Sequence, residues 1–176
     1  MAGPEALSPG ELVTLAGENL AGDSAVRLYV NGQAATVLSA SDVQITAVIP
    51  MVEAESYRLV ARHSGLDSAV IQVAARRASP RITGVNRRGD GIAEIFATGL
   101  GRLEAVAGSP LARTAETVKV LFDGPGGVIE MAPMYSGAAP GQAGRYQVNV
   151  AVPDGWVSGA IRLSTAGIES EAVFID

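Results

Sequence analysis

The sequence predicts an all-β protein made of two tandem antiparallel β-sandwiches. Apolar residues alternate with polar ones over most of the 176 residues, and the spacing of an amphipathic helix is scarce. The run "VQITAVIP" (43–50) is answered by "YQVNVAVP" (146–153), where Gln again precedes alternating apolar residues and Pro again ends the run. The chain therefore carries one β unit twice.

The predicted elements follow the same order in both halves. In the first half a strand with its turn, a hairpin, a Pro-ended strand and a second hairpin occupy 11–20, 25–38, 42–50 and 56–74. In the second half these elements return at 93–101, 117–131, 145–153 and 159–175. Units of roughly 80–95 residues with frequent turns are typical of immunoglobulin-like sandwiches. A single eight-stranded barrel is the alternative, but each copy is long enough for its own core.

The turns are marked by a small set of residues. Asn-Gly in the first copy and Asp-Gly in the second are two-residue signals for a hairpin. The two glycines beside Leu100 permit positive φ while the leucine points into the core. We therefore expect a structural, non-chemical role for Asn31, Gly32, Asp123, Gly124, Gly99 and Gly101.

The predicted domains are 1–78 and 79–176, joined at the charged, Pro-containing "ARRASPRI". Corresponding residues lie further apart later in the chain, so the second copy must contain insertions. They fall near 102–116 and 132–144, where small residues with Gly and Pro predict surface loops.

The two copies differ at their beginnings. The second opens with "SPRITGVNRRGDG", in which Ile82 and Val85 can form a leading strand, whereas the first has only "MAGPEAL". Either the segment starts after its leading strand, or the first sandwich lacks one. A missing edge strand exposes unpaired backbone groups, to which another chain can add a strand. We therefore hypothesise an assembly edge on the first sandwich.

Composition narrows the possible functions. Hydrophobic residues make up 48% and aromatics 5%, which predicts an aliphatic core. A net charge of −5 argues against a general nucleic-acid binder. With no Cys and a single His, His63, we predict no catalytic residue, cofactor or metal site and no enzyme activity. No apolar run reaches the length of a membrane span. The alternative of a Ca²⁺ site would draw on Glu18, Asn19, Asp23 and Asp123.

Two aromatic residues are the candidates for a ligand. Trp156 follows the Pro-ended strand of the second copy, and Tyr135 lies in the second insertion. Aromatic rings with a polar edge can stack on sugars, so a carbohydrate-binding module is the alternative function. Otherwise Trp156 covers its own core.

Four stretches resemble a known module: "SPGELVTLAGENL", "IFATGLGR", "SPLARTAETVKVLFDG" and "GRYQVNVAVPDG". They are similar to a tandem β-sandwich module at the C-terminus of large secreted proteins of acidobacteria, Solibacter-like ones especially, and each half resembles the IPT/TIG group. The resemblance implies export, with a signal peptide outside this segment, and an extracellular or cell-surface location. It supplies no catalytic residues for this chain. We expect a structural or adhesion module that spaces, anchors or assembles a bacterial surface or secreted protein, with protein partners at its sheet edges.

Overall fold

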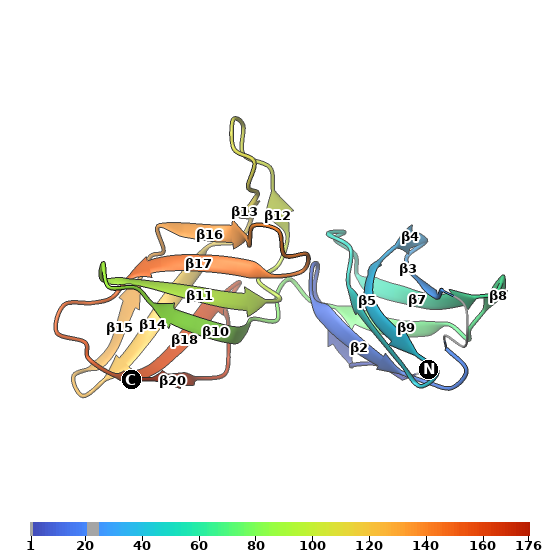
Figure 1. Ribbon diagram of the computed structural model, residues 1–176, viewed down its shortest axis with the longest axis horizontal. Helices are drawn as coiled ribbons and strands as arrows, with labels where there is room; N and C mark the ends of the chain where they lie inside the picture. Colours follow the sequence, from blue (N-terminus) through green and yellow to red (C-terminus); the bar gives the residue numbers. More distant parts are fainter. Residues whose placement is uncertain (1, 21–24) are drawn as a thin grey trace. The chain divides into compact units, whose positions relative to one another are not determined.

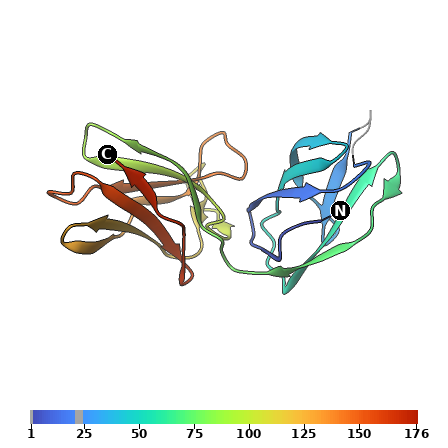
Figure 2. The same cartoon turned by 90° about the horizontal axis from the view of Figure 1, so that it is seen from below.

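A computed structural model describes residues 2–20 and 25–176 of the chain. The chain splits into two compact units, Met1–Arg77 and Ala78–Asp176, called here the N-terminal and C-terminal units. Every regular element in the described residues is a strand (Figure 1 and Figure 2). The described residues contain no helix that is long and apolar enough to cross a membrane. The predicted all-β class, with two tandem immunoglobulin-like sandwiches, is confirmed.

The N-terminal unit packs two sheets against each other. One has the strand order β2-β6-β5, and the other has the order β1-β9-β7-β3-β4 with β8 paired to β7. All pairs are antiparallel except β1 with β9. The strands are β1 (Ala6–Leu7), β2 (Leu12–Ala16), β3 (Arg27–Val30), β4 (Gln33–Ala34), β5 (Thr36–Ser41), β6 (Gln44–Val48), β7 (Ser56–His63), β8 (Leu66–Asp67) and β9 (Ile71–Ala75).

The C-terminal unit also has two sheets. The first has the order β10-β11-β17-β16-β13-β12, and the second has β15-β14-β18-β19 with β20 paired to β18. The strands are β10 (Arg81–Arg87), β11 (Ile92–Thr98), β12 (Leu103–Glu104), β13 (Arg113–Thr114), β14 (Val118–Gly124), β15 (Gly127–Met131), β16 (Tyr135–Ala138), β17 (Tyr146–Ala151), β18 (Gly159–Thr165), β19 (Ile168–Glu169) and β20 (Val173–Ile175).

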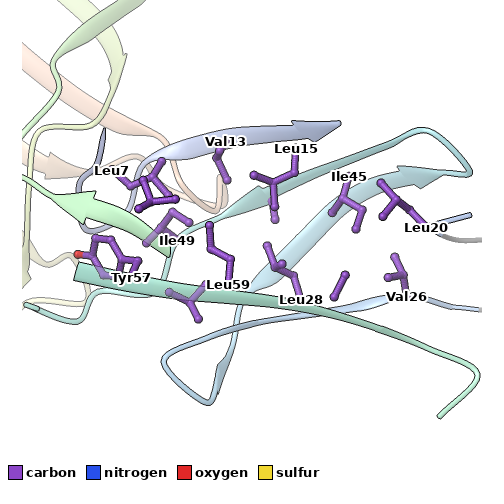
Figure 3. Close-up of a cluster of buried hydrophobic side chains, with 14 residues drawn as sticks. Leu7, Val13, Leu15, Leu20, Val26, Leu28, Ile45, Ile49, Tyr57 and Leu59 are labelled. Carbon is purple, nitrogen blue, oxygen red and sulfur yellow. The ribbon is translucent and has the colours of Figure 1, made fainter. Parts of the chain in front are cut away.

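Alternation along the strands creates a core in each unit. Val13 and Leu15 of β2 are buried, whereas their neighbours on the strand are exposed. Figure 3 shows Leu15 in one cluster with Leu28, Ile45 and Leu59 from both sheets. The expectation of an aliphatic core is incomplete, because half of the eight aromatic residues are buried: Tyr57, Tyr146, Phe122 and Trp156.

The leading segments of the two units pair differently. In the C-terminal unit β10 covers the whole outer edge of β11. In the N-terminal unit residues 2–7 form a short leading segment, so the strand is shortened and redirected rather than missing. Ala2 bridges Ala16 at the end of β2, and β1 then crosses to pair with β9 in the other sheet. The rest of β2 is therefore left at the edge of its sheet.

Both predicted insertions contain short strands as well as loop. β12 and β13 pair with each other, and the segment between them projects away from the sheet (Figure 1). β16, from the second insertion, pairs with β17 along its full length. Part of the inserted sequence thus widens the sheet, because Tyr135 to Ala138 find open backbone groups on β17.

The turn residues take the conformations that their chemistry allows. Asn31 and Gly32 join β3 to β4 with φ of 50° and 83°. Asp123 and Gly124 are the last paired residues of β14, so the turn itself lies one step further on. Gly99 has a φ of 69°, and a Cβ there would meet the Ser79 carbonyl oxygen at 2.0 Å. This position requires glycine for two independent reasons.

Candidate functional site

The first sheet of the C-terminal unit, with the order β10-β11-β17-β16-β13-β12, carries a half-buried group of polar and aromatic side chains on its outward face. Strand register places Phe96 beside Gln147, and Glu94 beside Asn149 and Tyr135. These five residues, from β11, β17 and β16, are called the outer platform. Because side chains two apart on a strand share a face, the same alternation that buries Ile95 and Val148 turns the platform outward.

The polar centre of the platform is internally ordered. Gln147 Nε2 donates to Glu94 Oε1 at 2.8 Å and to Asn149 Oδ1 at 3.0 Å. A carboxylate only accepts, so it fixes the orientation of the Gln147 amide, which in turn fixes that of Asn149. Within the described residues, the second carboxylate oxygen of Glu94, the Gln147 carbonyl oxygen and the Asn149 NH₂ group then retain free capacity.

Tyr135 forms one border of the platform. Its hydroxyl donates to the Ala138 carbonyl oxygen at 2.7 Å, which lays the ring along its own strand. A Cβ on Gly137 would meet the Tyr135 hydroxyl at 2.7 Å, so glycine provides the room for the ring. The Arg113 guanidinium lies 5.6 Å from the ring centroid. Burial raises the pKa of Tyr135, partly offset by the charge of Arg113, so the phenol stays a donor at neutral pH.

Phe96 forms the opposite border. The Arg145 guanidinium lies 5.4 Å from its ring centroid, and Arg145 Nη1 donates to Gln142 Oε1 at 2.7 Å. Neither Arg145 nor Arg113 has a carboxylate partner among the described residues. Two cations held over aromatic rings thus flank the amide centre.

Trp156 is placed elsewhere in the unit. Only 7% of it is exposed, and its ring meets Phe122 edge to face at 5.1 Å between centroids. Its Nε1 donates to the Asp123 carbonyl oxygen at 2.9 Å. The indole therefore covers the core beneath its loop, and no contact joins it to Tyr135 in the described part of the chain. A cavity of about 280 Å³ adjoins it, lined by residues 124–127, Ile129 and residues 154–158.

The corresponding face of the N-terminal unit has simpler chemistry. Thr14 and Thr46 occupy the places of Glu94 and Asn149, with their hydroxyl oxygens 3.2 Å apart. Ala16 stands where the C-terminal unit has Phe96, beside Gln44. Among the described residues at these matching positions, this face offers small hydroxyl and amide groups and no aromatic ring.

The edge of β2 is the distinctive feature of the N-terminal unit. Ala16 exchanges both backbone bonds with Ala2, so its amide points away from β6. Because amide direction alternates along an antiparallel strand, Leu12 and Thr14 also direct their backbone groups outward. Among the described residues no strand pairs with them there, and the Leu12 side chain is 41% exposed.

The residues considered for catalysis and ion binding are otherwise engaged or scattered. The single histidine, His63, has no partner at Nε2 within the described residues. The carboxylate of nearby Asp67, which could orient an imidazole, pairs with Arg62 at 2.6 Å instead. No group of three His, Asp or Glu side chains gathers there for a metal ion. Asp23 lies outside the described residues.

Sequence reasoning missed most of the platform. The sequence pattern places Glu94, Phe96, Gln147 and Asn149 in predicted strands and indicates no site that joins them. The available signal was the outward register of "AEIFA" and "YQVNV", where large polar and aromatic residues occupy positions that the first copy fills with Thr and Ala.

Comparison with known proteins gives limited matches. No curated protein matches the chain. The solved structures similar to it include gamma-CGTase from Alkalophilic bacillus clarkii, with 14% identity and a TM-score of 0.40 over 97% of this chain and 23% of that one. The plexin A4 extracellular region has 14% identity and a TM-score of 0.39 over 94% of this chain and 14% of that one.

The surface glycan-binding protein PbSGBP-B from Prevotella bryantii is similar at 14% identity, with a TM-score of 0.31 over 94% of this chain and 36% of that one. The chain thus spans well under half the length of each of these proteins.

The family comparison is specific to one unit. The IPT/TIG domain model matches residues 2–74, which is nearly all of Met1–Arg77. This confirms the IPT/TIG resemblance for the first half and points to an immunoglobulin-like module of a non-catalytic kind. The chain is therefore similar to IPT/TIG domains over residues 2–74.

Proposed function

We propose that the chain is a non-catalytic extracellular module that spaces, anchors or assembles a bacterial surface or secreted protein, through strand pairing at the open edge of β2. It would act as a tandem pair, in the manner of the acidobacterial secreted proteins that its sequence resembles. The supporting observation is the contrast between β11, which β10 covers, and β2, where no strand among the described residues covers Leu12 and Thr14.

Strand addition suits this edge physically. An added strand satisfies the outward amides and carbonyls of β2 and covers the exposed Leu12 side chain. The C-terminal unit contains an example of the required partner, because the residues of β10 pair antiparallel with β11. A second copy of the chain, or another part of the parent polypeptide, can supply such a segment.

The test is light scattering coupled to size exclusion, over a concentration series of the full chain. We expect the mass to rise with concentration. Thr14→Pro removes an outward N–H without removing a backbone hydrogen bond to β6, so this variant stays monomeric. The matched control is Ala40→Pro on β5, the opposite edge of the same sheet, where the amide also points outward.

Circular dichroism confirms that both variants are folded. A wild-type chain that remains monomeric throughout the series contradicts the proposal. Loss of association in Ala40→Pro but not in Thr14→Pro assigns it to the wrong edge and also contradicts it.

A further inference from the structure

We infer that the outer platform of the C-terminal unit binds an acidic saccharide chain. It lies in a different unit from the β2 edge and does not depend on the assembly proposal. The inference starts from side chains that are ordered by one another while their remaining hydrogen-bonding capacity points outward.

The centre of the platform suits sugar hydroxyls. Glu94 and the carbonyl oxygen of Gln147 can accept, and the NH₂ group of Asn149 can donate. A hydroxyl both donates and accepts, so adjacent hydroxyls of a sugar ring can use these groups together. Because the Glu94–Gln147–Asn149 chain of bonds already fixes the side chains, little conformational entropy is lost when a ligand binds.

The borders of the platform suit carboxylates. Arg113 over Tyr135 and Arg145 over Phe96 hold their guanidinium groups beside the hydroxyl-binding centre. Guanidinium groups bind carboxylates in a bidentate manner, and neither arginine has a carboxylate partner in the described residues. The rings beneath them offer an apolar edge to the carbon side of a sugar.

The layout also selects the length and class of ligand. Arg113 on β13 lies three strand spacings from Phe96 on β11, about 14 Å. A ligand that reaches both borders is therefore an oligosaccharide rather than a single sugar. An acidic peptide fits less well, because it lacks the adjacent ring hydroxyls that can donate and accept together at the Glu94–Gln147–Asn149 centre.

The test is calorimetric titration of the full chain with oligogalacturonates, a uronate-bearing probe. Arg113→Gln and Asn149→Ala should each weaken binding about tenfold or more. Both changes lie on the sheet surface, and a thermal melt checks folding. The matched control is Gln44→Ala in the N-terminal unit, the counterpart of Gln147, which should leave binding unchanged.

Two further ligands test whether binding requires both carboxylates and sugar hydroxyls. A neutral oligosaccharide of the same length should bind at least tenfold more weakly, because it leaves the arginines unpaired. Polyglutamate should also bind more weakly, because it lacks hydroxyls. The inference is overturned if oligogalacturonates do not bind, if either competitor binds as tightly, or if Arg113→Gln and Asn149→Ala bind like the wild type.

Discussion

The two units share their buried strand positions and differ at their solvent-exposed positions. Their buried positions correspond closely, as with Leu15 and Ile95, which are both fully buried on matching strands. Their outward positions have diverged, with Thr14 in one unit and Glu94 in the other. The leading segment covers β11 in one unit and leaves β2 at an edge in the other. The repeat is therefore visible in the buried residues, whereas the exposed residues and the leading segment give each unit different surface chemistry.

Core truncation gives the largest expected effect and tests whether the units are independent. Leu15→Ala and Ile95→Ala should each cost about 3 kcal/mol, because each leaves a cavity among fully buried neighbours. Each should lower the unfolding transition of its own unit and leave the other transition in place. Differential scanning calorimetry measures this, and a single shared transition that shifts in both variants would show that the units unfold together.

The matching left-handed turns should respond in opposite ways. Asn19, with a φ of 52°, stands where the C-terminal unit has Gly99. Gly99→Asn should destabilise the C-terminal unit by about 2 kcal/mol or more, because its Cβ would collide with the Ser79 carbonyl oxygen. Asn19→Gly should change stability by less than about 0.5 kcal/mol. Urea titration of both variants tests the difference, and equal losses would argue against the close approach at Gly99.

Substitution of Trp156 tests whether this residue stabilises the C-terminal unit or binds a ligand. Trp156→Phe should cost about 1 kcal/mol, because the Asp123 carbonyl oxygen loses its donor. Oligogalacturonate affinity should stay the same, since the indole lies outside the outer platform. Chemical denaturation and the calorimetric titration measure the two effects, and a variant of unchanged stability but lost affinity would place the ligand at Trp156 instead.

The smallest expected effect concerns the Arg62–Asp67 ion pair on the N-terminal unit. The Arg62 hydrogen bond lowers the pKa of Asp67 below its ordinary value. The stabilisation is therefore present above the unfolded-state pKa and is lost as the pH falls through the lower folded-state pKa. Both side chains are about half exposed, so the contribution is small. Unfolding of Asp67→Asn and wild type should differ slightly at neutral pH and converge in acid.

The sequence was informative about buried periodicity and less so about pairing partners. Alternation around Ile45 and Val148 predicted strands because burial imposes a period of two. It could not show that β1 crosses to β9, since two residues carry no period of their own. It also could not join Glu94, Gln147 and Tyr135 into one site, because they meet only through the register of three strands.

Amide hydrogen exchange at Thr14 and Glu94 tests the central contrast most directly. The two residues occupy matching positions, and both direct their amides toward the leading segment of their unit. At low concentration the Thr14 amide should exchange rapidly and the Glu94 amide slowly, because only Glu94 is paired there. At high concentration Thr14 should become protected as another strand covers it. Equal protection of both amides at low concentration would show that the β2 edge is closed and would contradict the account.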